Sequence, residues 1–269
     1  MTICIAAASD DSKSLVLASD ALWTSMSLSL EFEHPLEKMT LLAPGCVALT
    51  AGDALAHIEL FRAVKGRIEE GSVGVSAIVN LMVSEYRRLR NQRIEGVLLA
   101  RSGFDSIEHF QKQQRILLPD VVLGIQQRID NFNYGLDVIV AGMDRSTTHI
   151  YGISNPGVSL CFDAMGFHAI GSGLPHAVTT LIGRGCNQFI SLRECLMYVY
   201  EAKKMAEKAP GVGDRTTHMM IIRGTEGHKL EPEEIKRVSD SYEKWRKNER
   251  NWEAHINELL EGGSSPRTG

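Results

Sequence analysis

Cysteine is scarce and scattered in this sequence. The 269 residues include five cysteines, an odd number with no C-x-x-C pair: Cys4, Cys46, Cys161, Cys186 and Cys195. This spacing argues against a disulfide framework and against a structural zinc site. We therefore expect the protein to fold in a reducing compartment, and the cytoplasm fits best.

Long apolar runs and an excess of positive charge are also lacking. The apolar stretches have the length of strands, far short of the ~20 residues that a membrane helix needs. The N-terminus has no basic region ahead of an apolar segment, so we expect no signal peptide. Lysine and arginine number 29 against 33 aspartates and glutamates, which leaves a net charge of −4. We accordingly expect neither nucleic acid nor a membrane as a partner.

The familiar short motifs of catalysis and cofactor binding are absent too. The sequence has no H-E-x-x-H, no G-x-S-x-G, no Walker loop and no glycine-rich dinucleotide fingerprint. Its nine histidines stand singly, and each is better explained as a structural or surface residue than as a catalyst. These absences favour a protein without a metal or another cofactor. Two candidate features are left, Thr2 near the N-terminus and the turn Gly171-Ser172-Gly173.

The sequence does contain well-spaced strand-like and helix-like segments. Short runs rich in Val, Ile and Leu predict strands at residues 2–8, 14–19, 46–51, 136–141, 149–153, 158–162, 167–170 and 217–222. Apolar residues at three- and four-residue spacing predict helices at 55–68, 75–89, 175–183 and 191–208. Strands come in hairpins and helices in pairs, which argues against a doubly wound parallel fold. The order predicts an α+β fold with two sheets between layers of helices.

Two further segments depart from this pattern. Residues 91–132 mix charged, glutamine-rich and apolar patches, and we expect a partly helical insertion there. Residues 226–261 predict a C-terminal helical extension. Its apolar positions follow a heptad-like spacing at Ile235, Val238, Tyr242, Trp245, Trp252, Ile256 and Leu259. Such a helix either docks its apolar stripe on the core or binds a partner or second subunit, and residues 262–269 have the composition of a disordered tail.

Thr2 gains a special chemistry if Met1 is removed. Threonine is small enough for methionine removal to be routine, and that step would expose the α-amine of Thr2. Nucleophile and base are then on one residue, because the hydroxyl attacks while the α-amine, with a pKa of roughly 7.7–8.0, takes up the proton. A threonine that simply begins a strand is common, so Thr2 alone identifies no enzyme.

The context of Thr2 is more specific. The relevant stretches are Thr2-Ile3-Cys4-Ile5 with Leu17-Ala18-Ser19-Asp20, Glu37-Lys38-Met39, Ala51-Gly52-Asp53, DVIVAGMD at 137–144, and Ala169-Ile170-Gly171-Ser172-Gly173. In order and spacing they resemble the proteasome β-subunit family and the bacterial HslV peptidase. The resemblance spans residues 2–225. It implies an N-terminal-nucleophile (Ntn) hydrolase domain there, with a four-layer αββα sandwich that contains the insertion.

The resemblance also implies catalytic roles for five residues. Thr2 would be the nucleophile, and the charge of Lys38 would lower the proton affinity of its hydroxyl and amine. Asp20 would pair with Lys38 and orient it. The N–H of Gly52 would stabilise the oxyanion, and Ser172 would orient the Thr2 amine.

Substrate-binding residues follow from the same resemblance. Thr24 would contact the substrate backbone, while Trp23, Thr50 and Ala54 would line a small, uncharged pocket. The family's Asp-x-x-Ser-Gly motif is absent near Asp214. Either Asp214 or an HslV-like arrangement substitutes for it, or the Thr2 amine is held less firmly. The insertion and the C-terminal extension are further departures from the simplest members.

Three functions stay open at this point. The first is a threonine endopeptidase that forms a homo-oligomeric ring, cleaves peptides or unfolded proteins, and is fed by an ATPase partner. The second is an Ntn amidase or transpeptidase with a small substrate, because one fold hosts many chemistries. The third is a non-catalytic assembly subunit in which the C-terminal helix is the working part, and retention of Met1 would favour it.

Overall fold

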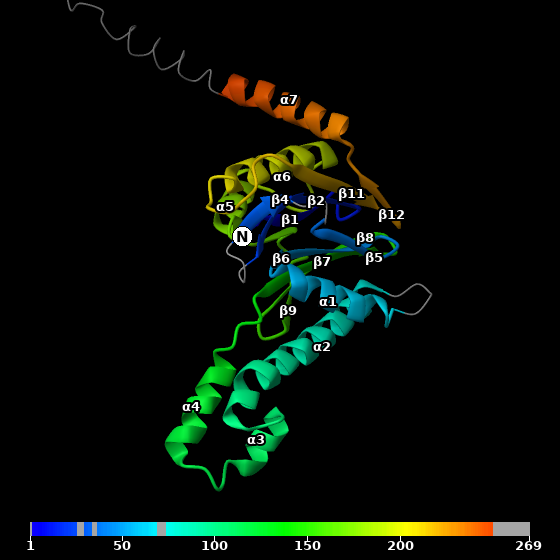
Figure 1. Ribbon diagram of the computed structural model, residues 1–269. Coiled ribbons are helices and arrows are strands. Elements are labelled where there is room, and N and C mark those ends of the chain that lie inside the picture. Colours follow the sequence, from blue (N-terminus) through cyan, green and yellow to red (C-terminus); the bar gives the residue numbers. More distant parts are fainter. Residues whose placement is uncertain (1, 26–29, 34–36, 69–73, 250–269) are drawn as a thin grey trace, which may run out of the picture.

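The computed structural model describes residues 2–25, 30–33, 37–68 and 74–249, with the backbone alone for 24–25, 30–33 and 249. This part of the chain is an α+β protein (Figure 1). Its strands are β1 (Cys4–Ser9), β2 (Ser14–Asp20), β3 (Leu22–Ser25), β4 (Leu30–Glu33), β5 (Met39–Ala43), β6 (Cys46–Gly52), β7 (Leu136–Asp144), β8 (Thr147–Ser154), β9 (Val158–Cys161), β10 (Phe167–Ile170), β11 (Thr217–Arg223) and β12 (Glu226–Lys229). Its helices are α1 (Ala54–Lys65), α2 (Val75–Ile94), α3 (Ile107–Gln113), α4 (Pro119–Asp130), α5 (Leu174–Gly183), α6 (Leu192–Ala206) and α7 (Pro232–Glu249), with a π-helical turn η1 (Glu95–Leu99) and a 3₁₀ turn η2 (Ala100–Ser102).

The strands form two five-stranded sheets and one small hairpin. The first sheet has the order β10-β1-β2-β11-β12, and the second has the order β5-β6-β7-β8-β9. Neighbouring strands in both sheets are antiparallel. The predicted hairpin of residues 2–8 and 14–19 is confirmed as β1 and β2, which place Cys4 opposite Ser19. The prediction of antiparallel sheets rather than a parallel doubly wound sheet is therefore correct.

Strands β1 and β2 are buried on both faces. Successive side chains of a strand point to opposite sides. In β1, Cys4 and Ala6 pack against residues of the second sheet, while Ile5 and Ala7 pack against residues of α5 and α6. A strand buried on both faces reads as a continuous apolar run, which is why this hairpin is readable from sequence.

Helices cover the outer face of each sheet (Figure 1). One apolar cluster joins α5 and α6 to the first sheet, and another joins α1 and α2 to the second. Asp53 caps α1 by accepting from the N–H groups of Leu55 and Ala56. Ser191 and Glu194 form the capping box that starts α6. Local capping signals thus set where two of the covering helices begin.

Residues 95–132 form a helical lobe at the far end of α2 (Figure 1). The predicted insertion is partly helical, as expected, although α2 itself continues past Asn91 to Ile94. The lobe has its own small core, made of Ile94, Leu99, Phe104, Phe110, Ile125 and Ile129. Arg90 ties it to α2, because its Nη2 donates to the carbonyl oxygens of Ile129 and Phe132 at 3.0 and 3.1 Å.

The C-terminal extension begins as part of the body, by which we mean the two five-stranded sheets and the helices that cover them. β12 pairs with β11, and α7 then lies against α6. The ring of Tyr242 contacts that of Tyr200 edge-on at 5.5 Å, and the guanidinium of Arg184 lies 4.2 Å from the Trp245 ring centroid. This packing agrees with the docking interpretation as far as Glu249. The predicted seam positions Trp252, Ile256 and Leu259 and the tail at 262–269 lie outside the described residues.

Strands β3, β4, β5 and β12 lie where the sequence predicts none. In the β3–β4 hairpin, Leu22 is opposite Glu33 and Thr24 is opposite Glu31. β12 is exposed along its whole length. Charged residues interrupt β4 and β12, whereas β3 and β5 are only four and five residues long and show no clear alternation, so none of the four has a strong sequence signal.

Candidate active site

Thr2 lies just ahead of β1 with its side chain buried. Its carbonyl oxygen accepts a hydrogen bond from the Gly173 N–H at 3.2 Å. Gly171 has a φ of 101°, and a Cβ at this position would come within 2.2 Å of the same oxygen. Only glycine allows that approach. The turn Gly171-Ser172-Gly173 thus fixes the backbone of Thr2.

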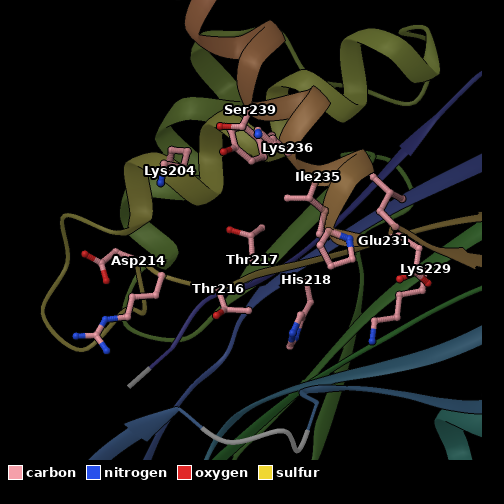
Figure 2. A pocket seen from close by; sticks show the side chains of 14 residues that line it. Lys204, Asp214, Thr216, Thr217, His218, Lys229, Glu231, Ile235, Lys236 and Ser239 are labelled. Carbon is pink, nitrogen blue, oxygen red and sulfur yellow. The ribbon is translucent and has the colours of Figure 1, made fainter.

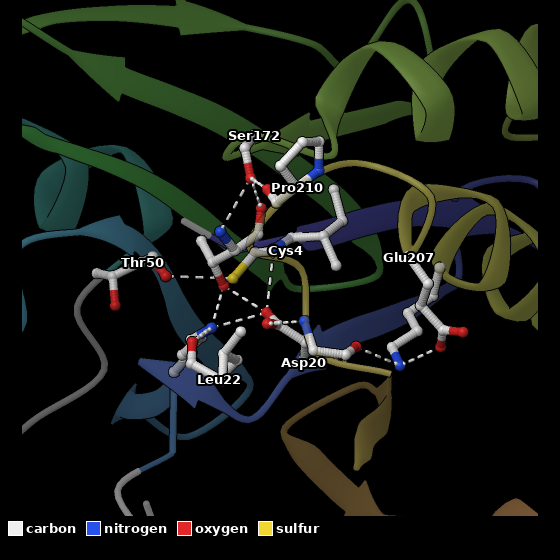
Figure 3. Close-up of polar contacts among 12 residues, drawn as sticks. Cys4, Asp20, Leu22, Thr50, Ser172, Glu207 and Pro210 are labelled. Carbon is white, nitrogen blue, oxygen red and sulfur yellow. Dashed lines mark hydrogen bonds and ion pairs between the residues drawn. The ribbon is translucent and has the colours of Figure 1, made fainter. Parts of the chain in front are cut away.

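The Thr2 hydroxyl joins a buried group of three polar side chains. Thr2 Oγ1 donates to Asp20 Oδ1 and accepts from Lys38 Nζ. Figure 3 labels Asp20 at the centre of these polar contacts. Lys38 Nζ also lies 2.7 Å from Asp20 Oδ1. The exposed fractions of Thr2, Asp20 and Lys38 are 2, 0 and 2 %. Because water does not screen these groups, their charges act on the hydroxyl at low effective dielectric constant.

Asp20 is held from two sides at the end of β2. Its Oδ1 accepts from the Ile3 N–H at 3.0 Å, in addition to Thr2 and Lys38. Its Oδ2 accepts from the Gly213 N–H at 2.9 Å. The carboxylate plane is therefore fixed by contacts with the neighbouring strand and with the loop before β11.

Lys38 is held by its backbone and by its ammonium group. The Thr50 N–H of β6 donates to the Lys38 carbonyl oxygen at 3.1 Å, immediately before β5 begins. The ammonium donates to the Leu22 carbonyl oxygen as well as to Thr2 and Asp20. It also lies 5.4 Å from the centroid of the Trp23 ring, a cation–π distance. Its three N–H groups thus have three acceptors, which sets its orientation.

A cavity of about 400 Å³ opens beside Thr2. Its walls include Thr2, Gly52, Gly135, Asp137 and Ser172. Ser172 Oγ accepts from the Thr2 N–H at 3.3 Å and lies 3.3 Å from the carbonyl oxygen of Pro210, to which it can donate. The sequence-predicted Thr2, Asp20, Lys38, Gly52 and Ser172 are therefore brought to one place, with three of them on the cavity wall.

Gly52 is the last residue of β6 and is exposed to this cavity. Its φ is 122°, and a Cβ there would lie 2.1 Å from the Gly135 carbonyl oxygen. Only glycine fits this conformation and this contact. The close contact with Gly135, which also lines the cavity, therefore requires glycine at position 52.

The residues expected to line a specificity pocket lie elsewhere. Trp23 and Thr50 are buried, Ala54 is half-buried in the first turn of α1, and none of them lines the cavity beside Thr2. His57, which sequence reasoning passed over, stacks on Trp23 at 4.9 Å. Burial lowers the pKa of His57, so this ring is a neutral packing partner. Thr24 lies on β3, where the structure describes its backbone only.

Asp214 faces a different cavity. A cavity of about 590 Å³ lies between α6, β11 and α7, and Asp214 lines it together with Lys204, His218 and Lys236 (Figure 2). Within the described residues, Asp214 makes no hydrogen bond to Thr2 or to Ser172. The neighbouring Gly213 contacts Asp20 instead. The prediction that Asp214 substitutes for the missing motif thus has no contact in the structure to support it.

Cys4 is a second nucleophilic side chain close to the site, and it is fully buried. Its thiol lies 3.2 Å from the Thr50 carbonyl oxygen. Burial raises the pKa of the Cys4 thiol to about 12, although the charge of Lys38 opposes the rise. A thiolate is the reactive form of cysteine, so Cys4 is inert and Thr2 is the candidate nucleophile.

Several contributions to the site come from backbone atoms. The Leu22 carbonyl oxygen binds the ammonium of Lys38, and the Gly213 N–H binds Asp20. The Pro210 carbonyl oxygen is a neighbour of Ser172. A backbone group carries no residue-type signal, so none of the three was predictable as a site residue. Gly213 is a partial exception, since a glycine pair flanking Val212 marks a tight loop.

Within the described residues, no cluster of three or more His, Cys, Asp or Glu side chains has the geometry of a metal site. The helices in that part of the chain are too short or too polar to span a bilayer. No protein-family model matches the sequence, and a search of curated proteins finds no significant match.

Proposed function

We propose that the chain is an N-terminal-nucleophile hydrolase of the proteasome β-subunit type, a threonine endopeptidase whose nucleophile is Thr2. One observation carries the proposal. Thr2 Oγ1 lies between the buried charges of Asp20 and Lys38 at the edge of a cavity. These residues come from separate segments of the chain, and the fold brings them together without exposing them.

The proposed reaction begins once Met1, which lies outside the described residues, has been removed. Thr2 Oγ attacks the scissile carbonyl carbon, and the Thr2 α-amine accepts the hydroxyl proton. The carbonyl π electrons move onto oxygen, and the N–H of Gly52 stabilises that oxyanion. Collapse of the intermediate breaks the C–N bond, the leaving amine takes the proton, and an ester on Thr2 is left. Water then attacks the ester by the same route and regenerates Thr2.

Lys38 and Asp20 have different electrostatic roles. The ammonium of Lys38 touches Thr2 Oγ1, so its charge stabilises the alkoxide character that develops during attack. Asp20 neutralises the cation and fixes its direction. A buried ion pair is by itself weak evidence of function, because desolvation offsets its attraction. Here the Thr2 hydroxyl bridges the pair, and a purely structural pair does not need that hydroxyl.

Ser172 would orient the base. Its Oγ lies 3.3 Å from the Thr2 nitrogen, the atom that becomes the α-amine. Because Ser172 is also near the Pro210 carbonyl oxygen, its own position is restrained. The Thr2 nitrogen is therefore anchored even though the family's Asp-x-x-Ser-Gly motif is missing. This arrangement supports an amine held by Ser172 alone.

The packing also supports the αββα sandwich proposed from the sequence. One apolar cluster lies between the two five-stranded sheets, and one lies under each pair of covering helices. The layer order α5–α6, first sheet, second sheet, α1–α2 is the one that such a sandwich requires. The homo-oligomeric ring, the ATPase partner and the cytoplasmic location are parts of the same proposal. The described cysteines are all free, which suits a reducing compartment.

A small-substrate amidase is the second candidate, and one observation favours it. The cavity beside Thr2 has a volume of about 400 Å³, and Trp23, Thr50 and Ala54, which were expected to line a specificity pocket, do not line it. A peptidase with this cavity would accept only small, neutral side chains next to the cleaved bond. Cleavage assays with peptide amides and with small amides such as glutamine decide between the two.

The decisive experiment is an intact mass measurement with an epoxyketone inhibitor. This reagent bonds to both the hydroxyl and the free α-amine of an N-terminal threonine, so an adduct requires that Met1 is absent. We expect loss of Met1 and one adduct, mapped to Thr2. Thr2→Ala is the matched variant and should give no adduct. A chain that keeps Met1, or a free Thr2 that is never labelled, would falsify the proposal and favour the assembly subunit.

A further inference from the structure

Helix α6 carries a lysine with a fully buried side chain, Lys203. Lysine is almost never fully buried unless it is paired. Lys203 Nζ donates to Glu207 Oε1 at 2.5 Å and to the Gly213 carbonyl oxygen at 3.1 Å. The neighbouring Lys204 also pairs with Glu207, yet its side chain is 32 % exposed. Glu207 thus has a counterion near the surface already, and the ion pair alone does not explain why Lys203 is buried.

The second partner of Lys203 leads directly to the candidate active site. Gly213 accepts from Lys203 with its carbonyl oxygen and donates its N–H to Asp20 Oδ2 at 2.9 Å. A Cβ on Gly213 would lie 2.9 Å from Leu22 Cβ and 3.2 Å from Asp20 Oδ2. The loop therefore packs as closely against the catalytic carboxylate as a backbone can. Figure 3 shows Glu207 on the far side of this contact.

We propose that Lys203 is a positioning residue of the active site, which holds Gly213 against Asp20 and so fixes the carboxylate that orients Lys38 and Thr2. The inference rests on the proposed function, since it assigns a support to the same catalytic group. Glu207 is the counterion that keeps the buried ammonium in place. Glu207 thus contacts Lys203, which contacts Gly213. Gly213 in turn contacts Asp20, which binds Thr2.

The physical need for this support follows from the geometry of Asp20. Its Oδ1 is shared by Lys38, Thr2 and the Ile3 N–H, so the Gly213 N–H is what holds Oδ2. Without it the carboxylate can rotate about its Cβ–Cγ bond and carry Lys38 with it. Small displacements of a catalytic group lower reaction rates steeply. Burial lowers the pKa of Lys203, while Glu207 and the more distant charge of Asp20 oppose that effect.

The test compares two adjacent lysines that share a carboxylate. Lys203→Met removes the contact with Gly213, whereas Lys204→Met removes only a pairing with Glu207. The full-length protein is labelled with an epoxyketone, and the maximal labelling rate is separated from the half-saturating concentration. We expect Lys203→Met to lower the maximal rate about 10- to 100-fold with an unchanged half-saturating concentration, because Lys203 does not line the cavity. Lys204→Met should label like the wild type.

A second variant separates positioning from folding. Lys203→Met leaves the largely buried carboxylate of Glu207 with Lys204 as its ion-pair partner. Lys203→Met/Glu207→Gln replaces that carboxylate by a neutral amide, which is less costly to bury, and should melt closer to the wild type. If positioning is the role, the double variant keeps the slow maximal rate although its stability recovers. Full recovery of the rate together with stability, or equal rates for both lysine variants, would overturn the inference. A wild type that is never labelled refutes the proposed function itself, so the two failures are distinct.

Discussion

The Asp20 carboxylate is enclosed by the side chains of Thr2 and Lys38 and by two backbone N–H groups. Asp20→Asn keeps the shape but leaves the ammonium of Lys38 buried without a counter-charge. Removing one partner of a buried pair typically costs about 3–5 kcal/mol of unfolding free energy. We expect a loss of that size in urea denaturation, together with loss of epoxyketone labelling.

The matched control for Asp20→Asn removes both charges. Asp20→Asn/Lys38→Met should regain most of the lost stability, because no unpaired charge is left inside, but it should regain no labelling. If Asp20→Asn lowers the unfolding free energy by less than ~1 kcal/mol, the Asp20–Lys38 pair contributes no more than a solvent-exposed ion pair does. That result would contradict the buried geometry of the site.

Gly52 and Gly124 offer a paired test of backbone requirements. Gly52→Ala would place a Cβ 2.1 Å from the Gly135 carbonyl oxygen at a φ of 122°, so β6 and β7 must separate locally. Gly124 lies within α4 and has open space around it. We expect Gly52→Ala to destabilise the protein and abolish labelling. Gly124→Ala should stabilise the lobe by about 0.5–1 kcal/mol, since alanine is the better helix former; thermal unfolding and labelling rates check both.

The residues of the site divide into those with a sequence signal and those without one. Thr2 could be located because removal of Met1 would make it an N-terminal nucleophile, and Asp20, Lys38 and Ser172 because the stretches around them resemble the proteasome β-subunit family. Lys203 and Gly213 could not, because a lysine in a helix reads as a surface residue and a glycine reads as a turn. Their contacts join residues of α6, β2 and the loop before β11, and only the folded chain brings these together.

At the scale of elements, a histidine of β10 packs against β8. The His168 ring of β10 stacks on Phe162 at 3.7 Å and packs against Gly152 of β8. Burial lowers the pKa of His168 from 6.5 to about 4. The unfolded chain therefore binds a proton below pH 6.5 that the folded chain rejects until about pH 4. Stability should be complete above pH 6.5 and fall as the pH drops toward 4, by about 2 kcal/mol at pH 5.

The measurement for His168 is urea denaturation at pH 7 and pH 5. His168→Phe keeps an aromatic ring on Phe162 but cannot titrate. Its loss of stability between the two pH values should be smaller than that of the wild type by the amount stated above. Other buried histidines titrate in both proteins and cancel in the comparison. Equal pH dependence in the two proteins would show that His168 does not couple protonation to folding.

The elements themselves were predictable where burial leaves a pattern in the sequence, either a continuous apolar run or a helical spacing of apolar residues. Four strands are buried almost throughout and read as apolar runs: β1, β2, β6 and β7. Helices α1, α2 and α6 each bury a face on which apolar residues recur at helical spacing. The hairpin β3–β4 and the edge strand β12 depend on pairing with a neighbour. Strand pairing depends on the neighbouring strand, so it cannot be predicted from the residues of one short strand alone.

At the scale of the whole molecule, the helical lobe and the body have separate cores. Phe110 is fully buried within the lobe core, and its cluster shares only the partly buried Phe132 with a body cluster. Phe110→Ala should cost about 3–5 kcal/mol of lobe stability. Because α3 and α4 lie beyond the far end of α2 (Figure 1) and contribute no residue to the cavity beside Thr2, we expect faster hydrogen exchange in these helices with an unchanged labelling rate. Leu49→Ala, in the core between the sheets, should instead slow labelling and destabilise the body.

The long sequence separation within the site has a consequence for the timing of activity. Asp20 receives its last hydrogen bond from a residue 193 positions further along the chain, and the Thr2 nitrogen meets Ser172 across 170 positions. A ribosome must therefore deliver the chain at least as far as Gly213 before the proposed nucleophile has all its partners. Until then the growing chain holds an ordinary threonine. The enzyme proposed here would thus become active only late in its own synthesis.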